Sequence, residues 1–150
     1  MSTNLLRIIP TDPDWTPSER AAGDALAALR DLAPAASETV AVRHDEVTFL
    51  DQGTNFEAVR CPVCGAELDV DWWHEAMEAA HRGRFADLAA VVPCCGVRAS
   101  LNELDYDWPA GFARFVLEAR DPGRQGPTDE ELARVTAALG HPVRVIWAHY

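Results

Sequence analysis

The sequence contains no lysine and is short of positive charge. Its thirteen basic residues are all arginines, whereas aspartate and glutamate number 24, so the net charge at pH 7 is −11. A chain this acidic repels phosphate backbones, which argues against nucleic acid as the main partner. Its field favours basic protein surfaces instead. The missing lysine and the abundant alanine together suggest a high-GC bacterial source.

Long apolar runs are also missing. No stretch approaches the roughly 20 apolar residues of a membrane-spanning helix, and residues 1–10 lack the apolar run of a signal peptide. We therefore expect a cytoplasmic protein, in whose reducing surroundings cysteines act as thiols or metal ligands. Hydrophobic residues still make up 48% of the 150 residues, enough for the core of a single domain.

The short motifs of common catalytic sites are absent as well. There is no Gly-x-x-x-x-Gly-Lys loop, no Gly-x-Ser-x-Gly and no His-Glu-x-x-His. Glu75 follows His74, but the next histidine is His81, outside the spacing that zinc hydrolases use. A small enzyme would need a pocket in which groups such as His44, His74, Glu75 or Arg114 converge. We assign no catalytic residue and lean against an enzyme.

The cysteines are few but clustered, and the first pair lies in Cys61-Pro62-Val63-Cys64-Gly65. Pro62 presets a turn dihedral, and Gly65 permits a positive φ directly after the second sulfur. This segment resembles the zinc knuckle of zinc-ribbon proteins, whose signature is Cys-Pro-x-Cys-Gly. The resemblance implies that both thiolates bind one zinc ion.

The second pair, Cys94 and Cys95, departs from the zinc-ribbon pattern because its members are adjacent, although Gly96 still follows. Adjacent side chains of an extended segment point to opposite faces, so the chain must turn at Cys95-Gly96 for both sulfurs to reach one ion. His74 or His81 is the substitute ligand if one sulfur cannot. Four protein ligands leave no open position, so the predicted Zn²⁺ is structural.

Other readings of the cysteines stay open. They can be plain buried thiols or a redox pair. The adjacent Cys94-Cys95 pair also suits a soft-metal or redox sensor. Spacing and compartment together favour a bound metal.

Both ends of the chain share one pattern of elements: strand, loop, capped helix, strand. This resembles the ferredoxin-like fold, a four-stranded antiparallel sheet with both helices on one face. We predict a single α+β domain over 1–150, interrupted by a zinc-binding α/β insertion at 52–111. The alternative is one mixed α+β domain in which the strands of that segment extend the same sheet. The expected elements are strands at 5–9, 40–51, 56–60, 88–92, 112–119 and 143–150, and helices capped at Thr16, at Asp69 or Asp71, and at Thr128.

These features predict an acidic zinc-binding protein that works by binding another protein. An adaptor, a regulator or an immunity-type inhibitor of a basic partner fits the charge, the closed metal site and the missing catalytic motifs. Aromatic side chains left exposed would anchor such an interface. The interface candidates are Trp108, Trp147 and Tyr150. A small enzyme on the open sheet face is the alternative, by analogy of fold alone.

Overall fold

The computed structural model describes residues 2–150, which have the predicted α+β architecture. They form three helices, a four-stranded antiparallel sheet and two small two-stranded sheets. The order in the large sheet is β2-β7-β1-β8, and each neighbouring pair is antiparallel. Its strands are β1 (Asn4–Pro10), β2 (Glu38–Leu50), β7 (Gly111–Arg120) and β8 (Val143–His149). Within the described residues, no helix is long and apolar enough to cross a membrane.

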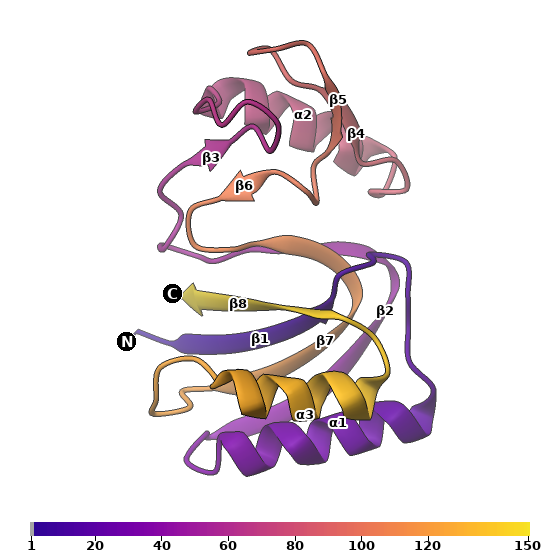
Figure 1. The fold of residues 1–150 in the computed structure, drawn as a ribbon, viewed down its shortest axis with the longest axis vertical. Helices are drawn as coiled ribbons and strands as arrows, with labels where there is room; N and C mark the ends of the chain where they lie inside the picture. Colours follow the sequence, from indigo (N-terminus) through magenta and orange to yellow (C-terminus); the bar gives the residue numbers. More distant parts are fainter. Residues whose placement is uncertain (1) are drawn as a thin grey trace.

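One face of the large sheet is covered by α1 (Glu19–Leu32) and α3 (Asp129–Leu139), as Figure 1 shows. Side chains alternate across each strand, so every second residue of β1 and β7 meets these helices. This helix-side core consists mainly of fully buried apolar residues: Leu6, Ile8, Ala25, Leu29, Phe115, Leu117, Ala119 and Val135. We call the large sheet with α1 and α3 the sheet unit.

The middle segment, residues 51–110, lies on the opposite side of the sheet from α1 and α3 (Figure 1). Its strands pair among themselves, β3 with β6 and β4 with β5. They do not join the four-stranded sheet in the part of the chain described, so the alternative of an extended common sheet is wrong. The elements are β3 (Val59–Arg60), α2 (Val70–Arg82), β4 (Ala89–Val91), β5 (Arg98–Ser100) and β6 (Asp105–Tyr106).

A second core joins the middle segment to one end of the sheet unit. The indole of Trp73 donates a hydrogen bond to the Tyr106 hydroxyl at 3.2 Å, and that hydroxyl donates to the Leu101 carbonyl at 2.7 Å. The rings of Phe49 and Phe112, from β2 and β7, have centroids 5.0 Å apart and belong to the same cluster. The polar ends of the buried aromatic side chains therefore have partners, as burial requires.

A buried amide links the two regions. Asn102 is 2% exposed. Its side-chain oxygen accepts a hydrogen bond from the Phe112 N–H at 2.9 Å, and its side-chain nitrogen donates to the Thr11 carbonyl at 3.1 Å. Arg144 on β8 donates to the carbonyls of Asn102 and Ala110, at 2.8 and 3.0 Å. These bonds fix the middle segment against β7, β8 and the residue that follows β1.

Most predicted elements agree with the structure to within a few residues, and one cap does not. Ser18, rather than Thr16, caps α1 by accepting a hydrogen bond from the Ala21 N–H at 3.1 Å. The Pro17 carbonyl accepts a bond from the Arg43 guanidinium at 2.5 Å, which holds Pro17 outside the helix. The pairing of β2 with β7 is interrupted by a register shift between Arg43 and Thr48.

Candidate metal centre

The first pair of cysteines lies in a tight turn that follows β3, which we call the first turn (Cys61–Gly65). The Gly65 N–H donates to the Cys61 carbonyl at 3.0 Å, and the Cys61 N–H donates to the Ala66 carbonyl at 2.9 Å. Gly65 has φ +75°, the positive value expected from the sequence. Inside the turn, the backbone N–H groups of Val63 and Cys64 point at the Cys61 sulfur, at 3.4 and 3.5 Å.

The second pair lies in an equivalent turn between β4 and β5, the second turn (Val92–Gly96). The Gly96 N–H donates to the Val92 carbonyl at 3.0 Å, and the Val92 N–H donates to the Val97 carbonyl at 3.0 Å. Gly96 has φ +71°. The chain therefore turns at Cys95-Gly96, and it repeats the hydrogen-bond pattern of the first turn.

Aligning the two turns explains the adjacent cysteines. Cys95 occupies the position of Cys64, directly before the glycine. The first position, which we call the base, holds Cys61 in one turn and Val92 in the other, with 1% and 0% exposed. The third position, which we call the tip, holds Val63, 67% exposed, and in the second turn Cys94. Compared with the first turn, the second turn therefore has a cysteine at its tip instead of at its base.

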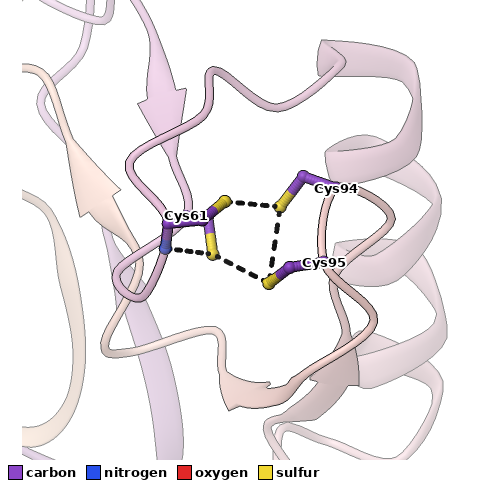
Figure 2. A group of neighbouring side chains, drawn as sticks. Cys61, Cys94 and Cys95 are labelled. Carbon is purple, nitrogen blue, oxygen red and sulfur yellow. Dashed lines mark hydrogen bonds between the residues drawn. The ribbon is translucent and has the colours of Figure 1, made fainter.

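The two turns bring all four sulfurs together. The Cys64 and Cys94 sulfurs are 3.3 Å apart, those of Cys61 and Cys95 3.8 Å, and those of Cys94 and Cys95 3.9 Å. All four lie within 4.8 Å of one another. Figure 2 shows Cys94 and Cys95 pointing from their loop toward Cys61. A tetrahedral ion with bonds of about 2.3 Å to sulfur separates its ligands by about 3.8 Å, so the cluster has the dimensions of a four-thiolate metal site.

The environment of the sulfurs is uneven. Cys61 is buried, whereas the other three are exposed. The backbone N–H of Cys64 lowers the pKa of Cys61. Burial opposes this effect, the N–H of Val63 adds to it, and the resulting pKa is about 6. Although Cys94 is exposed as a residue, desolvation of its sulfur by the neighbouring groups raises its pKa. The hydrogen bond with the Cys64 thiol adds to this effect, and the resulting pKa is about 12. The Val97 N–H favours the Cys95 thiolate, but desolvation and the Cys61 thiol outweigh it, so the pKa of Cys95 is raised.

The candidate substitute ligands lie outside the cluster. The group of mutually close donor atoms found in residues 2–150 consists of the four cysteines, without His74 or His81. The His74 ring packs against Trp73 with centroids 5.2 Å apart, and the His81 ring packs against Phe85 at 5.5 Å. Four donors of one kind are present without either histidine.

One cleft among residues 2–150 contains a group proposed for an enzyme, Arg114. Arg114 borders a cleft of about 290 Å³ together with Asp14, Asp45, Glu46 and Arg84. His44, His74 and Glu75 do not line that cleft. The condition set for catalysis, a pocket in which these groups converge, is not met there.

The three interface candidates differ in exposure. Trp108 is 43% exposed and Tyr150 is 45% exposed. Trp108 also has φ +57°, a backbone conformation that large residues rarely adopt. Trp147 is half-buried and packs against the helix-side core.

Sequence reasoning missed that the second turn copies the first. The signal was present, because Pro93 and Gly96 stand where Pro62 and Gly65 stand in the first turn. Reading from the prolines and glycines, rather than from the cysteines, pairs Val92 with Cys61.

The four clustered cysteines, placed in an α+β fold, could bind a metal ion such as zinc. Comparison of the chain with protein-family models, with curated proteins and with solved structures finds no match.

Proposed function

We propose that the protein binds one structural Zn²⁺ ion through Cys61, Cys64, Cys94 and Cys95. The observation that carries this proposal is the approach of all four sulfurs to within 4.8 Å of one another. Thiolates are soft ligands, which favours zinc over calcium or magnesium. Four protein donors leave no position for a substrate, so the ion serves folding rather than catalysis.

The ion would close the outer end of the middle segment. Its strands are two or three residues long, which gives each pair few hydrogen bonds. Zinc binding contributes on the order of 10 kcal/mol to the folding of small zinc peptides. We propose that residues 52–111 are an insertion in a single domain over 1–150. The strand order β2-β7-β1-β8, with α1 and α3 on one face, supports a ferredoxin-like frame around it.

We also propose that the protein works in the cytoplasm by binding a basic protein partner. The net charge of −11 supports electrostatic attraction to such a partner. The exposed indole of Trp108 and ring of Tyr150 supply the aromatic anchors that dominate many interfaces. An adaptor, regulator or immunity-type inhibitor matches this combination.

Metal content and thiol reactivity, measured together on untagged protein, test the metal proposal. We expect about one zinc per chain and no thiol that reacts quickly in the native protein. All four thiols should react once the protein is unfolded with a chelator present. Protein without metal, with four reactive thiols in the native state, would contradict the proposal.

Capture of partners from the host lysate tests the interaction proposal when variants are compared. A specific partner should elute at raised salt, because surface charges are screened. It should bind Trp108→Ala or Tyr150→Ala weakly and bind Val70→Ala normally, since Val70 is an exposed apolar residue outside the candidate surface. Equal capture by all variants would sink this assignment of the interface.

A further inference from the structure

We propose that Cys94 is an oxidation site, at which a hydroperoxide starts the formation of a Cys64–Cys94 disulfide that releases the metal. This inference rests on the proposed zinc site. It concerns the consequence of having the ligand Cys94 at the tip of the second turn while Val92 occupies the base.

The tip position leaves Cys94 exposed, as Cys64 and Cys95 are, where a cysteine at the base position would be buried. The equivalent tip residue, Val63, is 67% exposed, whereas the base residues Cys61 and Val92 are buried at 1% and 0% exposed. Cys94 is itself exposed. Susceptibility to oxidation follows thiolate character and exposure, and a bound zinc ion would hold Cys94 as a thiolate whatever the pKa of the free thiol. If both turns had a cysteine at the base and another before the glycine, two of the four sulfurs would be buried. In this protein only Cys61 is buried.

Geometry selects Cys64 as the partner of Cys94. Their sulfurs are 3.3 Å apart and must approach by about 1.3 Å to reach disulfide bonding distance. The Cys94 and Cys95 sulfurs are farther apart, at 3.9 Å, and a bond between adjacent residues closes a small strained ring. Cys61 is buried and receives two backbone N–H bonds, which shields its sulfur.

The chemistry takes two steps and balances with the hydroperoxide as the oxidant. The Cys94 thiolate attacks the peroxide, breaks its O–O bond and becomes a sulfenic acid, while hydroxide or alkoxide leaves. The Cys64 thiolate then attacks the Cys94 sulfur, forms the S–S bond and expels a second hydroxide. Two thiolates lose two electrons, and the peroxide gains them. A bound zinc ion would then keep only two of its four donors, Cys61 and Cys95, and would be released.

Hydrogen peroxide, added to zinc-loaded protein, tests the proposal with a chromophoric zinc indicator and peptide mass mapping. We expect zinc to be released in step with a disulfide that maps to Cys64 and Cys94. A thiol reductant with added zinc should restore the loaded protein. A disulfide that maps to Cys94–Cys95, or to Cys61, would overturn the proposal.

The matched control moves the cysteine back. The double variant Val92→Cys/Cys94→Val makes the second turn identical in sequence to Cys61–Gly65 and returns the ligand to a buried base position. It should bind zinc and release it at least about tenfold more slowly in peroxide, because the exposed tip thiolate is gone. Equal release rates in the two proteins would contradict the role of Cys94.

Two outcomes separate this inference from the zinc proposal. Reduced protein that holds zinc and retains it after peroxide would sink the oxidation site and leave the zinc site intact. Reduced protein that binds no zinc would sink both.

Discussion

The sheet unit and the middle segment are stabilised in different ways. The sheet unit has long paired strands and two capped helices around a fully buried apolar core. The middle segment has strands of two or three residues, one helix of 13 residues and the cysteine cluster at two of its turns. Its aromatic core packs against the end of the sheet unit through Phe49 and Phe112.

The two regions differ in how much stabilisation their own packing and hydrogen bonds provide. Apolar burial contributes about 25 cal/mol per Å², and the sheet unit obtains it from regular helix-on-sheet packing. The strands of the middle segment are two or three residues long and make few hydrogen bonds, so the proposed metal ion would supply a cross-link that these strands lack. We expect perturbations of the cysteines to act on one region and perturbations of the junction to act on both.

Cys61→Ser should have the largest effect, because it removes the buried ligand. We expect loss of zinc and loss of most of the binding free energy, on the order of 10 kcal/mol, from the middle segment. In hydrogen exchange, the amides of Cys61 or its replacement and of Val92 should lose protection, while those of β1 and β7 keep it. Val63→Ser, at the exposed tip, is the control and should change nothing. An equal loss of protection in both regions would show that they are one cooperative unit.

Asn102→Ala should come next, because Asn102 bonds both regions. The change leaves the buried Phe112 N–H and the partly buried Thr11 carbonyl without their partner, which should cost about 2–3 kcal/mol. Urea denaturation measures this loss. Asn55→Ala is the control: its half-buried side chain makes one bond, to the Trp147 carbonyl at 3.0 Å, and its loss should cost about 1 kcal/mol. Equal costs would contradict the role of Asn102 as the main polar link.

The smallest effect should come from an ion pair in the sheet unit, and it should depend on pH. The Arg124 guanidinium, with the Thr128 N–H, lowers the pKa of Glu131 from 4.5 to about 2. A carboxyl with a lower pKa in the folded protein stabilises the fold above its unfolded pKa. That contribution is lost as the pH falls from about 4.5 through about 2.

Arg124→Gln should therefore destabilise metal-free protein at neutral pH, and the difference from wild type should vanish near pH 2. Urea denaturation followed by circular dichroism measures both. Arg134→Gln is the control, because its pair with Glu130 is exposed on both sides, and exposed pairs contribute little. A difference between Arg124→Gln and wild type that persists at low pH would point to lost packing instead.

Much of the sheet unit follows from the sequence because local signals agree there with packing. Thr128 caps α3 as predicted, and the strands at both ends are within two residues of expectation. The cap of α1 was missed because a tertiary bond, from Arg43 to Pro17, decides between two good capping residues. Strands as short as β5 and β6 carry no period that a sequence can display.

The candidate site was predictable in its residues and not in its geometry. Cysteine spacing identified the four members, since each pair lies at a turn with proline and glycine. The uncertainty over the second pair came from the adjacency of Cys94 and Cys95, because adjacent side chains of an extended segment point to opposite faces. In the structure a tip sulfur reaches the cluster because the first turn faces it, and sequence separation contains no such information.

X-ray absorption at the zinc edge of the protein as isolated shows directly whether four cysteine sulfurs bind the ion. We expect a single shell of four sulfur atoms at about 2.3 Å from zinc. A shell with nitrogen at about 2.0 Å would mean that a histidine replaces one of the cysteines. Such a shell, or the absence of zinc, would contradict a four-thiolate site built from two equivalent turns.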